Sequence, residues 1–170
     1  MAMPDDGYRY ELVRGELVRL PMSAHQSSRI AIRIANRIGP FVEAGNLGNI
    51  AGADGAYIFA RDPYTVRIPD LSFVRAERLP PPDAWVKFLE LAPDLAVEVV
   101  SPSDSANEIQ DKVNEYLDVG VRLIWVVYPI QHTITVYSAD RIGRVLTDAD
   151  TLDGGDVLPG FSLPVAEIFA

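Results

Sequence analysis

Glu98 stands inside an aliphatic run, 94–100, that suits a central strand covered on both faces. Because side chains alternate between the two faces of a strand, either face would bury this carboxylate. An ionised carboxylate in such a place is costly unless it is paired with a cation or bound to a metal. Glu98 is therefore a candidate metal ligand. A structural salt bridge, or a strand end that reaches solvent, explains it equally well.

Asp70 follows Pro69 and begins a second apolar run, 71–74. An aspartate beside a proline is often a turn residue, and taken alone Asp70 is explained that way. Two acidic residues on two strands of one sheet can, however, converge at one edge of it. Carboxylates, a carbonyl and water are the ligands that Mg²⁺ or Mn²⁺ prefers, so Asp70 and Glu98 together predict a site for one of these cations.

Lys112 is the basic residue best suited to accompany such a site, and the only other lysine is Lys87. A lysine ammonium is a compact charge that can hold a water or lose its proton, which a guanidinium cannot do. Tyr116 lies four residues further on, on the same face of a predicted helix. The spacing also fits a surface ion pair with Glu108, four residues before Lys112, and spacing alone favours that alternative.

Weaker candidates lie near the start of the chain. Glu16, beside the glycine of a predicted hairpin, and His25, at the start of a predicted helix, could each contact a metal or a water. Arg29, Arg33 and Arg37 recur every fourth residue and form a basic stripe. Such a stripe is typical of the solvated face of an amphipathic helix, and contact with phosphate groups is the functional alternative.

The elements that must position these residues mix strand and helix periods. Alternating apolar runs around Arg14 and Gly15 predict a hairpin over 8–20, and isoleucines at helical spacing predict a helix over 24–44. Ser105 and Glu108 form a capping box, which predicts the start of a second helix. The remaining predicted elements are strands at 47–51, 56–60, 64–68, 71–74, 94–100, 122–128, 133–137 and 141–146, and helices over 106–118 and from 164. This order predicts an α/β fold with a mixed sheet.

The composition excludes several classes of protein. With 170 residues, 48% of them hydrophobic and 23% charged, the chain suits one ordered domain over residues 1–170. No apolar run approaches the roughly 18 residues of a membrane span. The absence of cysteine and of a signal-peptide pattern makes a cytoplasmic protein the default expectation. The net charge of −9 argues against a protein that coats nucleic acid non-specifically.

Several stretches carry a resemblance to a known family. Residues 10–17, 69–70, 93–103 and 158–164, with Lys112 and Tyr116 at their spacing, resemble the Uma-two family of putative restriction endonucleases. That family is placed in the PD-(D/E)XK nuclease superfamily. The resemblance implies a restriction-endonuclease-like fold, in which helices flank a central mixed β-sheet, here with an N-terminal β-hairpin.

The resemblance also implies a metal-dependent DNA endonuclease. Asp70 and Glu98 occupy the two acidic motif positions, and with the main-chain carbonyl of Val99 they would hold one or two Mg²⁺ or Mn²⁺ ions. Val100 stands where the superfamily has its lysine, and Lys112 on the next helix takes over that position. Lys112 would then position the attacking water and stabilise the transition state.

The remaining expectations concern contacts around this centre. Glu16 would hydrogen-bond a water on the metal, and Tyr116 would orient Lys112 or contact a phosphate. The arginine stripe (Arg29, Arg33 and Arg37) would contact the DNA backbone, and a homodimer would suit the cutting of both strands. The alternative is an inactive nuclease-fold domain that binds nucleic acid or serves assembly, because a fold does not fix a function.

Overall fold

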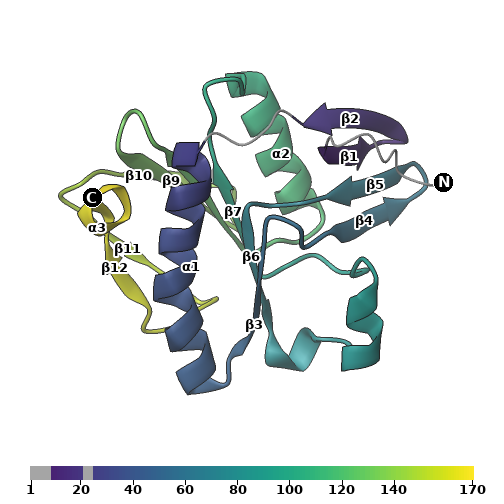
Figure 1. Cartoon of the computed structure of the whole chain (residues 1–170), viewed down its shortest axis with the longest axis horizontal. Helices are drawn as coiled ribbons and strands as arrows, with labels where there is room; N and C mark the ends of the chain where they lie inside the picture. The colour runs from purple at the N-terminus through teal and green to yellow at the C-terminus, as the bar shows by residue number, and fades with distance from the viewer. Residues whose placement is uncertain (1–8, 21–24) are drawn as a thin grey trace.

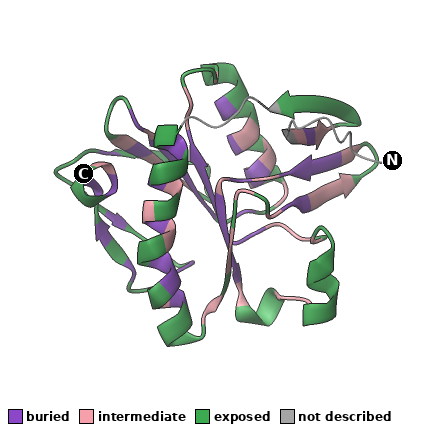
Figure 2. Cartoon of the chain, viewed as in Figure 1, coloured by how far each residue is buried: buried purple, intermediate pink, exposed green. Residues whose placement is uncertain are grey.

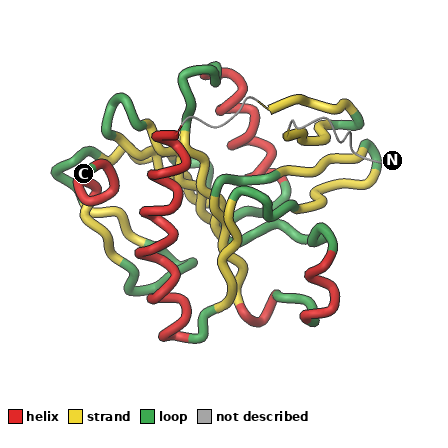
Figure 3. Tube along the Cα trace, in the orientation of Figure 1, coloured by secondary structure: helices red, strands yellow, loops and turns green. Residues whose placement is uncertain are grey.

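A mixed sheet forms the centre of the molecule. The computed structural model describes residues 9–20 and 25–170, and in that part of the chain the central sheet has the strand order β10-β9-β8-β7-β6-β3. Helix α1 lies on one face and helix α2 on the other (Figures 1 and 3). The predicted restriction-endonuclease-like arrangement of helices around a mixed sheet is therefore confirmed.

The bounds of the predicted elements lie close to the observed ones, whereas the 3₁₀ turns and the last two strands were not predicted. The helices are α1 (His25–Gly45), α2 (Ala106–Asp118) and α3 (Val165–Phe169), with 3₁₀ turns η1 (Ala76–Arg78) and η2 (Pro82–Val86). The central strands are β3 (Gly48–Gly52), β6 (Leu71–Arg75), β7 (Leu95–Val99), β8 (Leu123–Tyr128), β9 (Thr133–Ser138) and β10 (Gly143–Leu146). A second sheet has the order β2-β1-β5-β4, from β1 (Arg9–Val13), β2 (Glu16–Leu20), β4 (Tyr57–Arg61) and β5 (Tyr64–Arg67). The last two strands, β11 (Thr151–Asp153) and β12 (Ser162–Pro164), pair with each other.

Local sequence signals account for most of these boundaries. The hairpin turns at Arg14 and Gly15, both with positive φ (51° and 84°), a conformation that glycine adopts without strain. Ser105 and Glu108 form the predicted capping box at the start of α2. Gly120, with a φ of 92°, follows the end of that helix. Residues 8 and 24, which begin two of the predicted elements, lie outside the described residues.

Strand β7 lies between two apolar clusters, and its side chains alternate between them. Leu95, Val97 and Val99 belong to the larger cluster, which packs under α1, whereas Ala96 belongs to the cluster under α2. All five residues of β7 are buried (Figure 2). Because Glu98 shares the face of Ala96, its carboxylate points toward α2.

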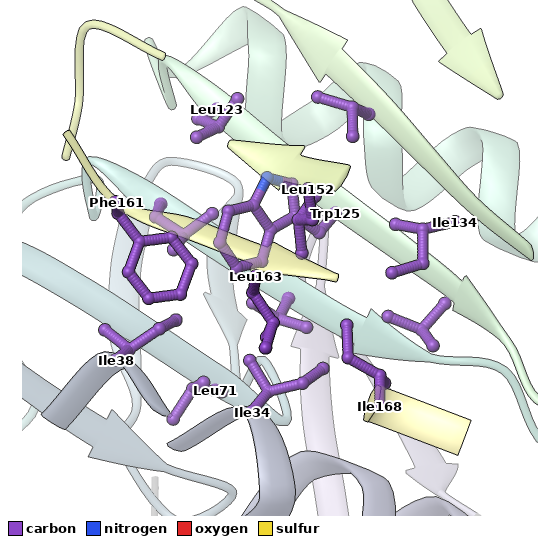
Figure 4. Packing of buried hydrophobic residues seen from close by; sticks show 14 of the residues in the cluster. Ile34, Ile38, Leu71, Leu123, Trp125, Ile134, Leu152, Phe161, Leu163 and Ile168 are labelled. Carbon is purple, nitrogen blue, oxygen red and sulfur yellow. The ribbon is translucent and has the colours of Figure 1, made fainter. Parts of the chain in front are cut away.

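The larger cluster anchors α1 and the C-terminal segment on the sheet. Ile34 and Ile38 of α1 pack with Leu71 of β6 and with Trp125 of β8 (Figure 4). The Trp125 ring stacks on that of Phe161 with the centroids 6.0 Å apart. Truncating a buried aromatic residue of this kind typically costs about 3–5 kcal/mol. The cluster thus fixes the strands from which the site residues project.

The division of the strands into three sheets was not predicted. The hairpin pairs with β5 through Leu12 and Val66, so β1 lies inside the second sheet and β2 at its edge. This places the hairpin next to the segment that leads from β5 to Asp70, and beside α2 (Figure 1).

Within the residues that the structure describes, no helix is both long enough and apolar enough to cross a membrane.

Candidate active site

Asp70 and Glu98 lie at the same end of the central sheet. Strands β6 and β7 are antiparallel, and their register ends with the pair Leu71 and Val97. Asp70 is the next residue on its side and Glu98 the next on the other. The Asp70 Oδ2 atom accepts a hydrogen bond from the Val99 backbone N–H at 2.8 Å. The two carboxylates therefore meet where the β6–β7 ladder stops.

Helix α2 presents two donors to Glu98. Lys112 Nζ donates to Glu98 Oε2 at 3.1 Å, and the Tyr116 hydroxyl donates to Glu98 Oε1 at 2.5 Å. Their spacing of four residues puts both side chains on one helix face. The Glu108 carboxylate instead accepts from the Ser105 backbone N–H at 2.8 Å, as part of the capping box. The pairing of Lys112 is thus with the strand carboxylate, 14 residues away in sequence, and the predicted alternative of a surface pair with Glu108 is not the contact it makes.

The environment shifts the acid–base properties of these groups. Burial raises the pKa of Glu98 to about 6, helped by the charges of Asp70 and Glu11 and opposed by Lys112 and Tyr116. Burial by itself would lower the pKa of Lys112, but the charges of Glu98 and Glu11 together raise it above its ordinary value. Burial and the same two carboxylates raise the pKa of Tyr116 well above its usual range. At neutral pH Lys112 is therefore a cation and Tyr116 a neutral donor.

The hydrogen bond that Tyr116 makes is neither of the two contacts predicted for it. The residue is fully buried, and its contact with a phosphate stays a prediction. Its hydrogen bond goes to Glu98 rather than to Lys112. Tyr116 thus fixes the orientation of the acid.

Sequence reasoning overlooked Glu11, which is the most buried charge beside this site. Its side chain is fully buried in β1, where Oε2 accepts from Arg67 Nη1 at 2.6 Å and Oε1 from the Ile68 backbone N–H at 3.0 Å. Arg67 also reaches Glu115 of α2, with Nε 2.8 Å from Oε2. Glu16, which was expected to assist the metal, is exposed next to the hairpin turn. The buried acid of the hairpin is therefore Glu11, and the role expected for Glu16 stays a prediction.

The arginine stripe on α1 holds the C-terminal helix. Arg29 Nη2 donates to the Ala170 carbonyl at 3.3 Å, and Arg33 Nη1 donates to the Ile168 carbonyl at 3.1 Å. Arg37 pairs with Glu167 at 2.8 Å. These contacts lie on the sheet face opposite Glu98, and the expected contact of the stripe with the DNA backbone stays a prediction. His25 is exposed at the first residue of α1.

The residues around Glu98 fit a divalent cation. Asp70, Glu98, Glu11 and Glu115 carry four negative charges when ionised, against the two positive charges of Lys112 and Arg67. Val99 follows Glu98 beyond the last β6–β7 register pair, and its N–H binds Asp70. Residues 9–20 and 25–170 contain no group of three or more His, Cys, Asp or Glu side chains placed to hold a metal. Two carboxylates with one carbonyl would leave the remaining ligand positions to water, as Mg²⁺ commonly requires.

A cleft of about 760 Å³ leads to this centre between the hairpin and α2. Lys112, Glu11 and Arg67 line its wall, and Arg14 stands at the hairpin turn. The Lys112 side chain is 19% exposed, whereas that of its partner Glu98 is only 6% exposed. The cleft therefore gives a ligand access to Lys112, which binds Glu98 of the acid pair (Asp70 and Glu98).

A solved structure shares the fold of this chain. The chain is similar to the crystal structure of a putative nuclease belonging to DUF820 from Anabaena variabilis ATCC 29413, with a TM-score of 0.87. The two sequences are 19% identical, and the match covers 98% of this chain and 93% of that one. At this identity the similarity shows a shared fold.

The sequence itself defines the family. Residues 1–166 match the Uma2 family, described as "Putative restriction endonuclease". The chain belongs to the Uma2 family, which confirms the resemblance seen in the sequence. The curated proteins contain no match to it.

Proposed function

We propose that this protein is a DNA endonuclease that hydrolyses phosphodiester bonds with the help of Mg²⁺ or Mn²⁺. One observation supports it above the others: Lys112 and Tyr116 of α2 both bind Glu98, which lies beside Asp70 at the end of the sheet. Two acids and a charged lysine are the groups that metal-assisted phosphodiester hydrolysis requires. Membership of the Uma2 family supports the same class of reaction.

Each side chain has a separate task in this proposal. Asp70, Glu98 and the Val99 carbonyl would hold the cation, which lowers the pKa of a bound water and polarises the phosphoryl group. The Lys112 ammonium orients the attacking water and stabilises the charge that develops on the phosphoryl oxygens. Tyr116 keeps one oxygen of Glu98 in place, so that the carboxylate does not rotate away from the cation.

Cleavage of DNA by matched variants tests this proposal. Glu98→Gln and Lys112→Met should each lower the rate at least about 100-fold, equivalent to about 2.7 kcal/mol in the barrier. Chelation of divalent metal should abolish cleavage, and Mg²⁺ or Mn²⁺ should restore it. Glu90→Gln, which removes an exposed carboxylate paired with Arg61, is the control and should cleave like the parent. Equal cleavage by the parent and Glu98→Gln would refute the proposal.

The alternative is a nuclease-fold domain without catalysis that binds nucleic acid or serves assembly. Two observations favour it: the net charge of −9, and Val100 at the position where the superfamily has its lysine. On this alternative, Mn²⁺ would not bind, and Asp70→Ala would fold and function like the parent. A homodimer, one domain over residues 1–170 and a cytoplasmic location stay predictions.

A further inference from the structure

Glu11 joins the hairpin to the segment that ends in Asp70. Its carboxylate accepts one hydrogen bond from the Ile68 backbone N–H and one from Arg67, and the residue is fully buried. Ile68 is followed by Pro69, whose ring fixes φ, and then by Asp70. The position of the Ile68 amide is thus passed to Asp70 through a short, stiff piece of backbone.

We propose that Glu11 is a positioning residue for the acid pair, which sets the place of Asp70 by holding the Ile68 amide. This inference rests on the proposed function for its catalytic consequence, but not for its structural one. Burying an ion pair between Glu11 and Arg67 adds little stability compared with apolar side chains of similar size. A geometric role accounts for the pair, because Asp70 in turn accepts from the Val99 N–H and so reaches the strand that carries Glu98.

A second buried carboxylate has the same kinds of partner as Glu11 but lies away from Asp70 and Glu98. Asp94 is also a buried carboxylate, with Oδ2 accepting from the Arg75 backbone N–H at 2.9 Å and Oδ1 lying 2.8 Å from Arg78 Nη1. Like Glu11, it combines one backbone amide with one arginine. It acts at the far end of β6, since Arg75 is the last residue of that strand and Asp70 precedes the first. Asp94→Asn therefore removes the same chemistry without touching the acid pair.

Hydrogen exchange tests the structural part of the proposal directly. In Glu11→Gln, the side-chain amide has only one oxygen to accept the hydrogen bonds from both the Ile68 N–H and Arg67. The Ile68 N–H is then held less firmly, and Asp70 loses its fixed position. The Val99 amide, which Asp70 protects, should then exchange about tenfold faster than in the parent. Asp94→Asn should speed exchange at the Arg75 amide and leave Val99 at the parental rate. Unchanged exchange at Val99 in Glu11→Gln would overturn the proposal.

Kinetics tests the catalytic part. Glu11→Gln should lower kcat for DNA cleavage about tenfold or more and leave KM within about twofold, because displacement of a reacting group affects turnover more than binding. Asp94→Asn should retain the parental kcat. A loss in Asp94→Asn as large as in Glu11→Gln would overturn the proposal, because any buried carboxylate would then have the same effect.

A second variant covers the case in which Glu11→Gln fails to fold. The double variant Glu11→Gln with Arg67→Met removes both charges of the buried pair, and it should show the same low kcat and fast Val99 exchange. Parental turnover in the double variant would overturn the proposal. If the parent fails to cleave DNA while Val99 exchange responds to Glu11 but not to Asp94, the positioning role stands and the proposed nuclease function fails.

Discussion

The raised pKa of Glu98 predicts a measurable loss of stability as the pH rises in the absence of metal. Burial raises this pKa from 4.5 to about 6, so between these values the unfolded chain ionises Glu98 while the folded protein keeps its proton. The free energy of unfolding should therefore be highest, as far as Glu98 is concerned, below pH 4.5 and fall through pH 6. The rise in the Glu98 pKa from 4.5 to about 6 corresponds to about 2 kcal/mol of unfolding free energy lost by pH 7.

Urea unfolding of the parent and of Glu98→Gln, both with chelator and between pH 4 and pH 7.5, isolates this effect. Glutamine does not titrate, so the stability of the parent relative to the variant should fall by about 2 kcal/mol across the window. Glu90→Gln is the control. The hydrogen bond from Arg61 lowers the pKa of Glu90, so the stability of the parent relative to this variant should rise with pH. A difference between parent and Glu98→Gln that stays constant with pH, or grows in favour of the parent, would refute the reasoning.

Three further predictions follow from the same contacts. Protons and cations compete for Glu98, so Mn²⁺ should raise the Tm of the parent more at pH 7.5 than at pH 5 and should raise that of Asp70→Asn little at either pH. Tyr116→Phe removes the donor to Glu98 Oε1, which should cost about 1–3 kcal/mol in unfolding free energy and raise the Glu98 pKa further, as measured by carboxyl NMR. Arg33→Ala loses its bond to the Ile168 carbonyl and should destabilise by about 1 kcal/mol, with DNA affinity measured by fluorescence anisotropy unchanged.

Local rules were sufficient to predict the positions that act along one helix or one strand. The capping box of Ser105 and Glu108 fixes where α2 begins, and the helical period then fixes that Lys112 and Tyr116 share a face. The aliphatic run around Glu98 predicts a buried strand from its composition alone. In each case the signal lies within a few residues of its effect.

The choice between the two hairpin acids depends on information that lies far away in the sequence. Glu11 pairs across the hairpin with Val18, and Glu16 with Val13, so all four side chains lie on one face and alternation cannot separate the acids. The two acids differ in the position of their strands. Glu11 is on β1, which lies between β2 and β5, whereas Glu16 is on the edge strand β2, next to the turn. That pairing joins residues more than 50 positions apart, and no local pattern reports it.

The contacts of the arginine stripe also depend on residues that lie far away in the sequence. The spacing of Arg29, Arg33 and Arg37 correctly places them beside the isoleucines of α1, and such a face is normally solvated. The contact from Arg33 to Ile168 spans 135 positions, and it turns part of this face into an interface with α3. Periodicity tells which side of a helix is polar, but not which distant segment lies on it.

In the proposed site, Lys112 of α2 binds Glu98 in place of the strand lysine that the resemblance implies at position 100. Position 100 comes directly after β7 and two residues after Glu98, so a lysine there would project on the side of Glu98 if the strand continued. Val100 stands there instead and packs against the apolar cluster under α2. That helix covers the same face, and Lys112 and Tyr116, one turn apart, reach the two oxygens of one carboxylate. A lysine from the strand would satisfy a single oxygen, whereas the helix supplies a charged and a neutral donor together. The helix thereby fixes both the charge and the orientation of Glu98, which the strand position alone would not do.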